Sequence, residues 1–100
     1  MCGRVVTQLT EHAGAEIFAM AAEDVPEFKP RWNAAPGVEH LIVANDGGRR
    51  RARRALWGFP AAHRRMVNAR GETAHVLPAF RRAFERRRVL MPVTGFFEWG

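Results

Sequence analysis

One hundred residues, of which 47% are hydrophobic, suffice for one domain with a packed core and exclude a disordered chain. No apolar run approaches the ~20 residues that span a bilayer, and the single cysteine excludes an intramolecular disulfide. We therefore expect a soluble cytoplasmic protein that does not bind membranes and is stabilised by packing.

The net charge of +6 is unevenly distributed along the chain. Residues 1–50 hold five Lys or Arg against seven Asp or Glu, whereas residues 51–100 hold eleven against three. All but one of the 16 basic side chains are arginine, whose planar guanidinium suits phosphate. A nucleic-acid partner is one interpretation of the basic half, and a solvated surface is the other.

The first predicted element is a short strand at residues 4–8 (RVVTQ). Thr10 can then cap a helix that ends before Pro26. Its apolar positions at helical spacing are Ala13, Ile17 and Ala21. Residues 25–38 are rich in proline and should form an irregular loop that carries Trp32 and Asn33.

A β-hairpin is predicted next. Residues 40–45 (HLIVAN) read as an apolar strand, and the Asp-Gly-Gly sequence at 46–48 is a strong turn signal. The return strand runs through five arginines to Trp57. We expect these arginines to line an exposed ribbon.

The second half contains three further predicted elements. Residues 66–70 (MVNAR) form a strand on which Asn68 and Arg70 share one face, and a helix at 78–87 follows. In that helix Phe80 and Phe84 should face the core while the arginines face outward. Residues 89–99 form a strand, broken at Pro92 or Gly95.

The only cysteine lies directly after the initiator methionine. Removal of Met1 would leave an amine and a thiol on adjacent carbons of Cys2, and both keep a reactive fraction near neutral pH. The amine can condense with an aldehyde, and the thiol can close on the imine carbon to give a thiazolidine. An inert packing cysteine is the alternative interpretation.

Glu98 lies between Phe97 and Trp99, an apolar setting that suits a carboxyl group to acid–base work unless it points to solvent. The four histidines lack the spacing of a metal site, and no phosphate-binding loop or nucleophile elbow occurs. We expect neither a metal nor a cofactor.

Five segments together resemble the SOS response-associated peptidase (SRAP) family, whose members shield abasic sites in single-stranded DNA. They are MCGR at 1–4, WNAAP at 32–36, LWGF at 56–59, NARGET at 68–73 and GFFEW at 95–99. The resemblance implies an α+β fold, mainly an antiparallel open barrel with short flanking helices. Residues 1–100 would be the N-terminal half of that single domain.

The resemblance further implies that Cys2, freed by removal of Met1, forms a thiazolidine crosslink with the ring-opened aldehyde of an abasic deoxyribose. Asn68 would orient the reacting groups, and Glu98 would shuttle protons. The implied DNA-binding residues are Arg4 and Arg70 at phosphates, Asn33 as a structural residue of the site loop, and Pro36 against a neighbouring base. Trp57 and Trp99 would pack around the site.

The implied partner is single-stranded DNA with abasic sites, and we expect a monomer that associates with the nucleoid if the protein is bacterial. A family histidine from a later H-x-R-M-P-like segment has no match here, because His63 and His75 lie in other motifs. Two alternatives stay open. One is a thiol peptidase that acts on its own N-terminus or on other peptides, and the other is a non-catalytic basic DNA-binding module.

Overall fold

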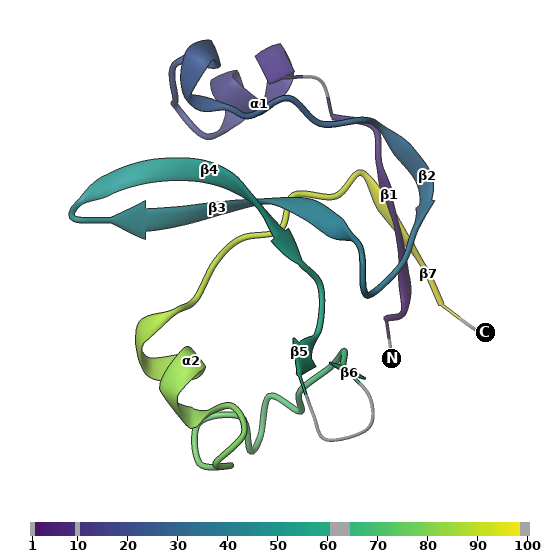
Figure 1. The fold of residues 1–100 in the computed structure, drawn as a ribbon, viewed down its shortest axis with the longest axis vertical. Helices are drawn as coiled ribbons and strands as arrows, with labels where there is room; N and C mark the ends of the chain where they lie inside the picture. The colour runs from purple at the N-terminus through teal and green to yellow at the C-terminus, as the bar shows by residue number, and fades with distance from the viewer. Residues whose placement is uncertain (1, 10, 61–64, 99–100) are drawn as a thin grey trace.

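The structure is a computed structural model that describes residues 2–9, 11–60 and 65–98. The predicted cap Thr10 lies outside these residues, as do Met1, His63 and Trp99. The elements of the described chain (Figure 1) are β1 (Arg4–Thr7), α1 (Glu11–Ile17), the 3₁₀ turn η1 (Ala22–Asp24), β2 (Arg31–Ala34), β3 (Glu39–Asp46), β4 (Arg49–Leu56), β5 (Phe59–Pro60), β6 (Arg65–Met66), α2 (Arg81–Arg86) and β7 (Gly95–Phe97).

The predicted α+β class with mainly antiparallel strands is confirmed. The strands form three antiparallel sheets, ordered β2-β1-β7, β3-β4 and β5-β6. No closed barrel forms among the described residues. None of the helices that the structure describes is long and apolar enough to cross a membrane.

The predicted first strand is confirmed as β1, the central strand of the three-stranded sheet. Its residue Val5 is buried and lies opposite the buried Ala34 of β2. Between the paired positions, two residues of β2, Trp32 and Asn33, oppose the single residue Val6. Such a bulge bends the strand and re-aims its side chains.

The prediction of an irregular loop over residues 25–38 is therefore wrong at β2. This segment has little strand signal of its own, but pairing with β1 satisfies its backbone groups. Tertiary pairing, which local sequence does not encode, turns it into a strand.

The predicted hairpin is confirmed as β3 and β4, which pair over their full length. Gly47 and Gly48 form its turn with φ of +58° and +79°, values that glycine adopts without a Cβ clash. Residues 40–44 of β3 are buried, because this strand has a continuous apolar run. The arginines of β4 are exposed, as predicted.

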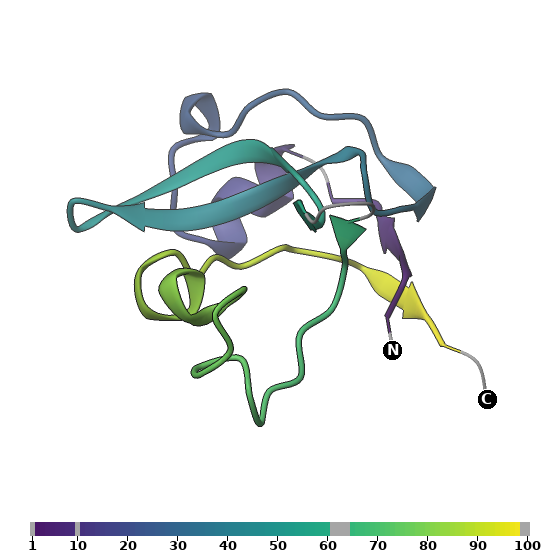
Figure 2. The same ribbon diagram turned by 60° about the horizontal axis from the view of Figure 1, so that its bottom comes forward.

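The core lies between the hairpin and the α1–η1 segment, which covers one face of it (Figures 1 and 2). Its buried centre consists of Ala15, Val25 and Leu41. Met20, Phe28 and Ala52 pack against this centre and are partly buried.

Helix α1 ends earlier than predicted, because it closes in a Schellman motif. The N–H of Met20 donates to the carbonyl of Ala15 at 2.8 Å. The N–H of Ala19 donates to the carbonyl of Glu16 at 3.3 Å, and Ala19 adopts a left-handed φ of 53°. This turn leaves the predicted helical residue Ala21 outside the helix and brings Met20 onto the core.

The predicted strand at residues 66–70 is wrong beyond Met66, where β6 ends. The chain enters a turn in which the N–H of Ala74 donates to the carbonyl of Arg70 at 2.9 Å. Asn68 and Arg70 therefore do not share a strand face.

The predicted second helix is present as the shorter α2. The Phe80 ring lies 5.4 Å from the Phe59 ring, and the Phe84 ring lies 6.1 Å from His75. These phenylalanines thus attach α2 to β5 and the preceding turn, not to the central core as predicted. The arginines of α2 are exposed, as predicted.

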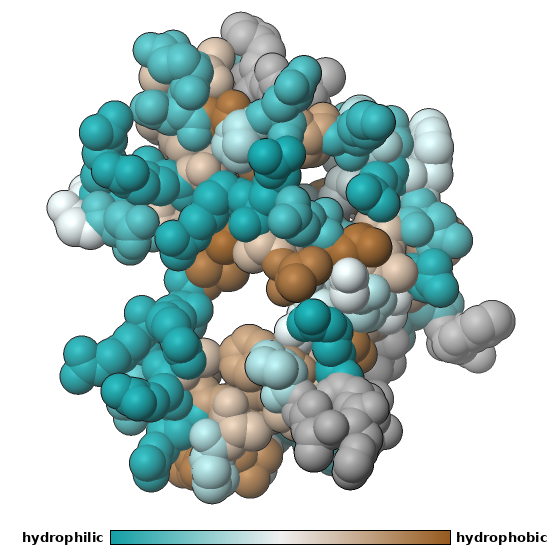
Figure 3. Space-filling model, in the orientation of Figure 1, coloured by the Kyte–Doolittle hydropathy of each residue, from teal (hydrophilic) through white to brown (hydrophobic). Residues whose placement is uncertain are grey.

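The last predicted strand is broken, as expected, around Pro92. Leu90 forms a single β-bridge with Val43, and β7 begins only at Gly95. Between this bridge and α2 the molecule is hollowed, as the space-filling view shows (Figure 3).

Candidate functional site

Cys2 lies just before β1 and is held by a residue far away in the sequence. Its carbonyl accepts a hydrogen bond of 2.8 Å from Nδ2 of Asn68, which is 66 positions distant. The Cys2 side chain is partly buried, and its Sγ lies 3.9 Å from the carbonyl oxygen of Arg4, a weak thiol contact. The only thiol of the chain is therefore carried by a residue whose main chain is fixed by Asn68.

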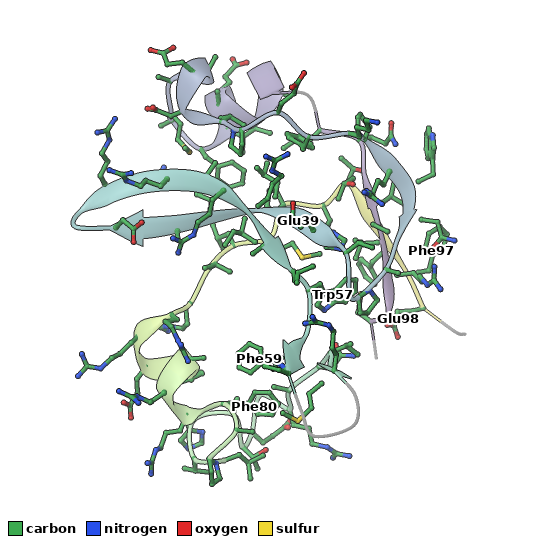
Figure 4. All side chains as sticks on the ribbon, viewed as in Figure 1. Glu39, Trp57, Phe59, Phe80, Phe97 and Glu98 are labelled. Carbon is green, nitrogen blue, oxygen red and sulfur yellow. The ribbon has the colours of Figure 1, made fainter. Side chains whose placement is uncertain are left out.

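Trp57 positions the segment that carries Asn68. Its indole Nε1 donates to the carbonyl of Val67 at 3.1 Å, one residue before Asn68. The indole is partly buried and meets the buried His40 edge to face, with 5.5 Å between ring centroids. Trp57 thus packs between the hairpin and this segment (Figure 4).

The turn that contains Pro36 is bound to the same tryptophan. The N–H of Gly37 donates to the carbonyl of Trp57 at 2.9 Å. On the other side of the turn, Nε2 of His40 lies 2.9 Å from the carbonyl of Ala35. Through its main chain and its indole, Trp57 connects this turn to the segment that binds the N-terminal residue.

Strand β7 brings Glu98 to the edge of the sheet where β1 begins (Figure 4). Arg4 pairs with Phe97, so Glu98 follows directly at that edge. Both Arg4 and Glu98 are exposed. A guanidinium, a carboxyl group and the N-terminal segment therefore share one edge of the three-stranded sheet.

Three other predicted site residues lie on surrounding segments. Arg70 is exposed at the start of the turn after β6. Asn33 is exposed in the bulge of β2, and Pro36 is partly buried in the turn that follows. The Asn68 side chain contacts Cys2 directly. Arg70 lies two residues further along the same segment, and the segment of Asn33 and Pro36 is connected to it through Trp57.

Two cavities, of about 560 and 810 Å³, lie away from these residues. The first lies between β3 and the segment before β2, with Glu39, His40 and Arg54 among its lining residues. The second lies between the hairpin and α2. Among the described residues no group of three metal-binding side chains comes together. The candidate site is thus a sheet edge outside both cavities.

The family comparison covers the complete chain. The model of the family described as SOS response associated peptidase (SRAP) matches residues 1–100. The chain belongs to the SRAP family. The resemblance carried by its five segments is confirmed.

Several curated relatives of this SRAP-family chain are named abasic site processing proteins. YoaM from Bacillus subtilis (strain 168) is 38% identical over 80 residues, which cover 73% of this chain and 35% of YoaM. YobE from the same strain is 35% identical over 80 residues, which cover 73% of this chain and 36% of YobE. YedK from Escherichia coli (strain K12) is 28% identical over 109 aligned positions, which cover 99% of this chain and 48% of YedK.

The SRAP-family chain therefore spans between 35% and 48% of the length of these relatives. No solved structure matches it. Sequence reasoning found the SRAP segments but missed two contacts that Trp57 makes with residues outside them. The bond from Trp57 to Val67 has no sequence signal, because every residue offers a carbonyl. The contact of His40 with Trp57 was not predicted, because His40 begins the apolar run of β3 and gave no signal of its own.

Proposed function

We propose that this chain recognises abasic sites in single-stranded DNA and shields them through a covalent crosslink to Cys2. Its membership of the SRAP family and the names of its relatives, abasic site processing proteins, support this proposal. The observation that carries it is the hydrogen bond from Asn68 to Cys2, since it joins a polar amide to the only residue with a thiol.

The chemistry follows from an N-terminal cysteine once Met1 is removed. The α-amine of Cys2 adds to the aldehyde carbon of the ring-opened deoxyribose, and loss of one water gives an imine. The thiol sulfur then bonds to the imine carbon, and the thiol proton passes to the nitrogen. The product is a thiazolidine, and the balanced reaction releases one water.

Asn68 holds the reacting residue in this proposal. Its Nδ2 donates to the Cys2 carbonyl, and we assign its Oδ1 to the substrate as an acceptor. An acceptor beside the N-terminus can orient the amine or a sugar hydroxyl. Because the donor bond fixes the Cys2 main chain, the amine and thiol approach the aldehyde in one orientation.

Glu98 transfers the protons that this reaction requires. A carboxylate can accept the proton that the amine loses, and the resulting acid can donate it to the departing hydroxyl of the carbinolamine. The position of Glu98 at the sheet edge where β1 begins supports this role.

DNA contacts follow from the exposed groups around this edge. Arg4 and Arg70 bind phosphates, because each presents a guanidinium on a segment next to Cys2. Asn33 shapes the loop through the β2 bulge, and Pro36 presses on a base beside the lesion.

The test is a denaturing gel of the Met1-processed protein with a single-stranded oligonucleotide that contains one abasic site. The protein should give a shifted band that survives denaturation. Cys2→Ala keeps the α-amine, so it should give a band only after the imine is reduced with borohydride. Lys29→Arg is the matched control, because Lys29 is the only lysine, and it should leave the band unchanged.

Three results would contradict the proposal. A stable band from Cys2→Ala without reduction would assign the crosslink to another group. A salt-sensitive, fully reversible shift without a covalent band would favour a binding module. Cleavage of an added peptide without a crosslink would favour a thiol peptidase.

A further inference from the structure

A groove of about 810 Å³ separates the β3–β4 hairpin from α2 and the segment after it. Figure 3 shows the molecule open between these two parts, with hydrophobic residues on the hairpin side of the opening and hydrophilic residues towards the outside. One wall carries Arg50 of β4, and the other carries Arg86 and Arg88. We call this feature the arginine groove.

The floor of the arginine groove is apolar. It contains Ile17, Phe18, Val43 and Leu90. Ile17 and Leu90 are 63% and 61% exposed, unusually high values for large aliphatic side chains beside a hydrophobic core. The floor therefore offers apolar surface that a ligand can cover.

The rim is positively charged. The lining contains three arginines, Arg50, Arg86 and Arg88, and a single carboxylate, that of Glu85. Arg50 already donates to the carbonyl of Phe18 at 2.8 Å, which fixes its guanidinium at the rim. Arg88 lies over the Phe84 ring, 5.5 Å from its centroid, so its guanidinium is also held in place.

We propose that the arginine groove binds single-stranded nucleic acid independently of any lesion. Arginines on both walls neutralise the phosphates, and unpaired bases cover the apolar floor. A duplex keeps its bases stacked inside and cannot offer them to such a floor. The lining carries three arginines against one glutamate, which favours a polyanion, and the apolar floor favours one with bases over an acidic peptide segment.

This inference extends the proposed function but does not depend on Cys2. Neither Cys2 nor Asn68 lines the groove, and its residues come from other elements. A groove that binds an undamaged part of the strand would keep the protein on single-stranded DNA until Cys2, at the sheet edge, meets an abasic site. Binding of undamaged DNA and crosslinking can therefore be measured separately.

The experiment uses fluorescence anisotropy with an undamaged fluorescent oligothymidylate at several salt concentrations. The test variant is Arg86→Gln with Arg88→Gln. The matched control is Arg81→Gln with Arg82→Gln, which removes the same charge from exposed residues of α2 that lie outside the groove. Thermal melting of each variant verifies folding.

The test variant should lose at least about tenfold in affinity, because two charge-assisted contacts are removed. The slope of log K against log salt should become shallower by about 1.4, since each neutralised phosphate of a single strand contributes about 0.7. The control should keep both values close to those of the parent chain. Equal losses of affinity in both variants would contradict binding in the groove, because they would show that the loss of any positive charge weakens binding.

The opposite wall gives a second, independent pair of variants. Arg50→Gln should weaken binding, whereas Arg51→Gln, exposed on the same strand outside the groove, should not. Polyglutamate should compete poorly, because it has no bases for the apolar floor. Competition equal to that of the oligonucleotide would overturn the assignment. Absence of a crosslink at abasic DNA would contradict the proposed function but leave these results standing.

Discussion

The two regions proposed to contact DNA are built in different ways. At the sheet edge, different residue types from distant segments are joined by specific bonds, such as that between Asn68 and Cys2. In the arginine groove, side chains of one type lie on two walls and are largely exposed. Loss of the Cys2 thiol alone should therefore abolish the stable crosslink at the first region, whereas the second should lose affinity in steps as single charges are removed.

The largest effect is expected from Cys2→Ser. The variant keeps the α-amine but replaces the thiol by a far weaker nucleophile, so the stable crosslink should disappear. Affinity for undamaged oligonucleotide should not change, because the groove is intact. Denaturing gels and anisotropy on the same preparation measure the two properties. A parallel loss of both would mean that the regions are not separate.

Trp57→Phe should have the next largest effect. It removes the indole donor and leaves the Val67 carbonyl without that partner, which should lower the free energy of unfolding by about 1–3 kcal/mol. Trp32→Phe is the control, since Trp32 is 74% exposed, and it should change stability by less than about 0.5 kcal/mol. Urea denaturation of both variants measures the two changes in the free energy of unfolding. Equal losses would show that the indole bond contributes nothing specific.

A smaller effect is expected from Asn68→Asp, which preserves shape but cannot donate to the Cys2 carbonyl. Loss of a hydrogen bond worth about 1 kcal/mol should slow crosslinking about fivefold. Single-turnover gels give the rate. Anisotropy with undamaged DNA serves as control and should not change. An unaltered crosslinking rate would remove Asn68 from the site.

The smallest effect on stability is expected from Ala19→Gly. Position 19 lies outside both regions. Ala19 has a φ of 53°, which glycine adopts without strain, so stability should rise by about 0.5–1 kcal/mol. Ala21→Gly, at an ordinary φ of −70°, should not stabilise the chain. Thermal melts compare the two. Crosslinking and DNA binding should be the same in both variants.

The sequence predicts best where local signals agree with the tertiary structure. The hairpin was predictable because an apolar run meets a glycine turn whose two residues need positive φ. β2 was not predictable, because its strand state depends on pairing with β1. α1 was predicted too long, since an alanine in the left-handed conformation at position 19 gives no signal of a helix end.

The candidate site was predictable as a set of residues but not as an arrangement. Position two marks Cys2 by its chemistry alone, and the SRAP resemblance points to Asn68. Their hydrogen bond involves the main chain of Cys2, which no side-chain pattern encodes. The arginine groove was visible only as excess charge, because its two walls are separated in the sequence.

The most direct test of the central claim is mass spectrometry of the crosslinked protein after nuclease and trypsin digestion. We predict that the abasic sugar is attached to the peptide of residues 2–4, with a mass equal to the sum of both parts less one water. Borohydride should leave that mass unchanged, because a thiazolidine has no C=N bond. Attachment to the peptide that contains Lys29, or a mass that increases on reduction, would contradict the claim.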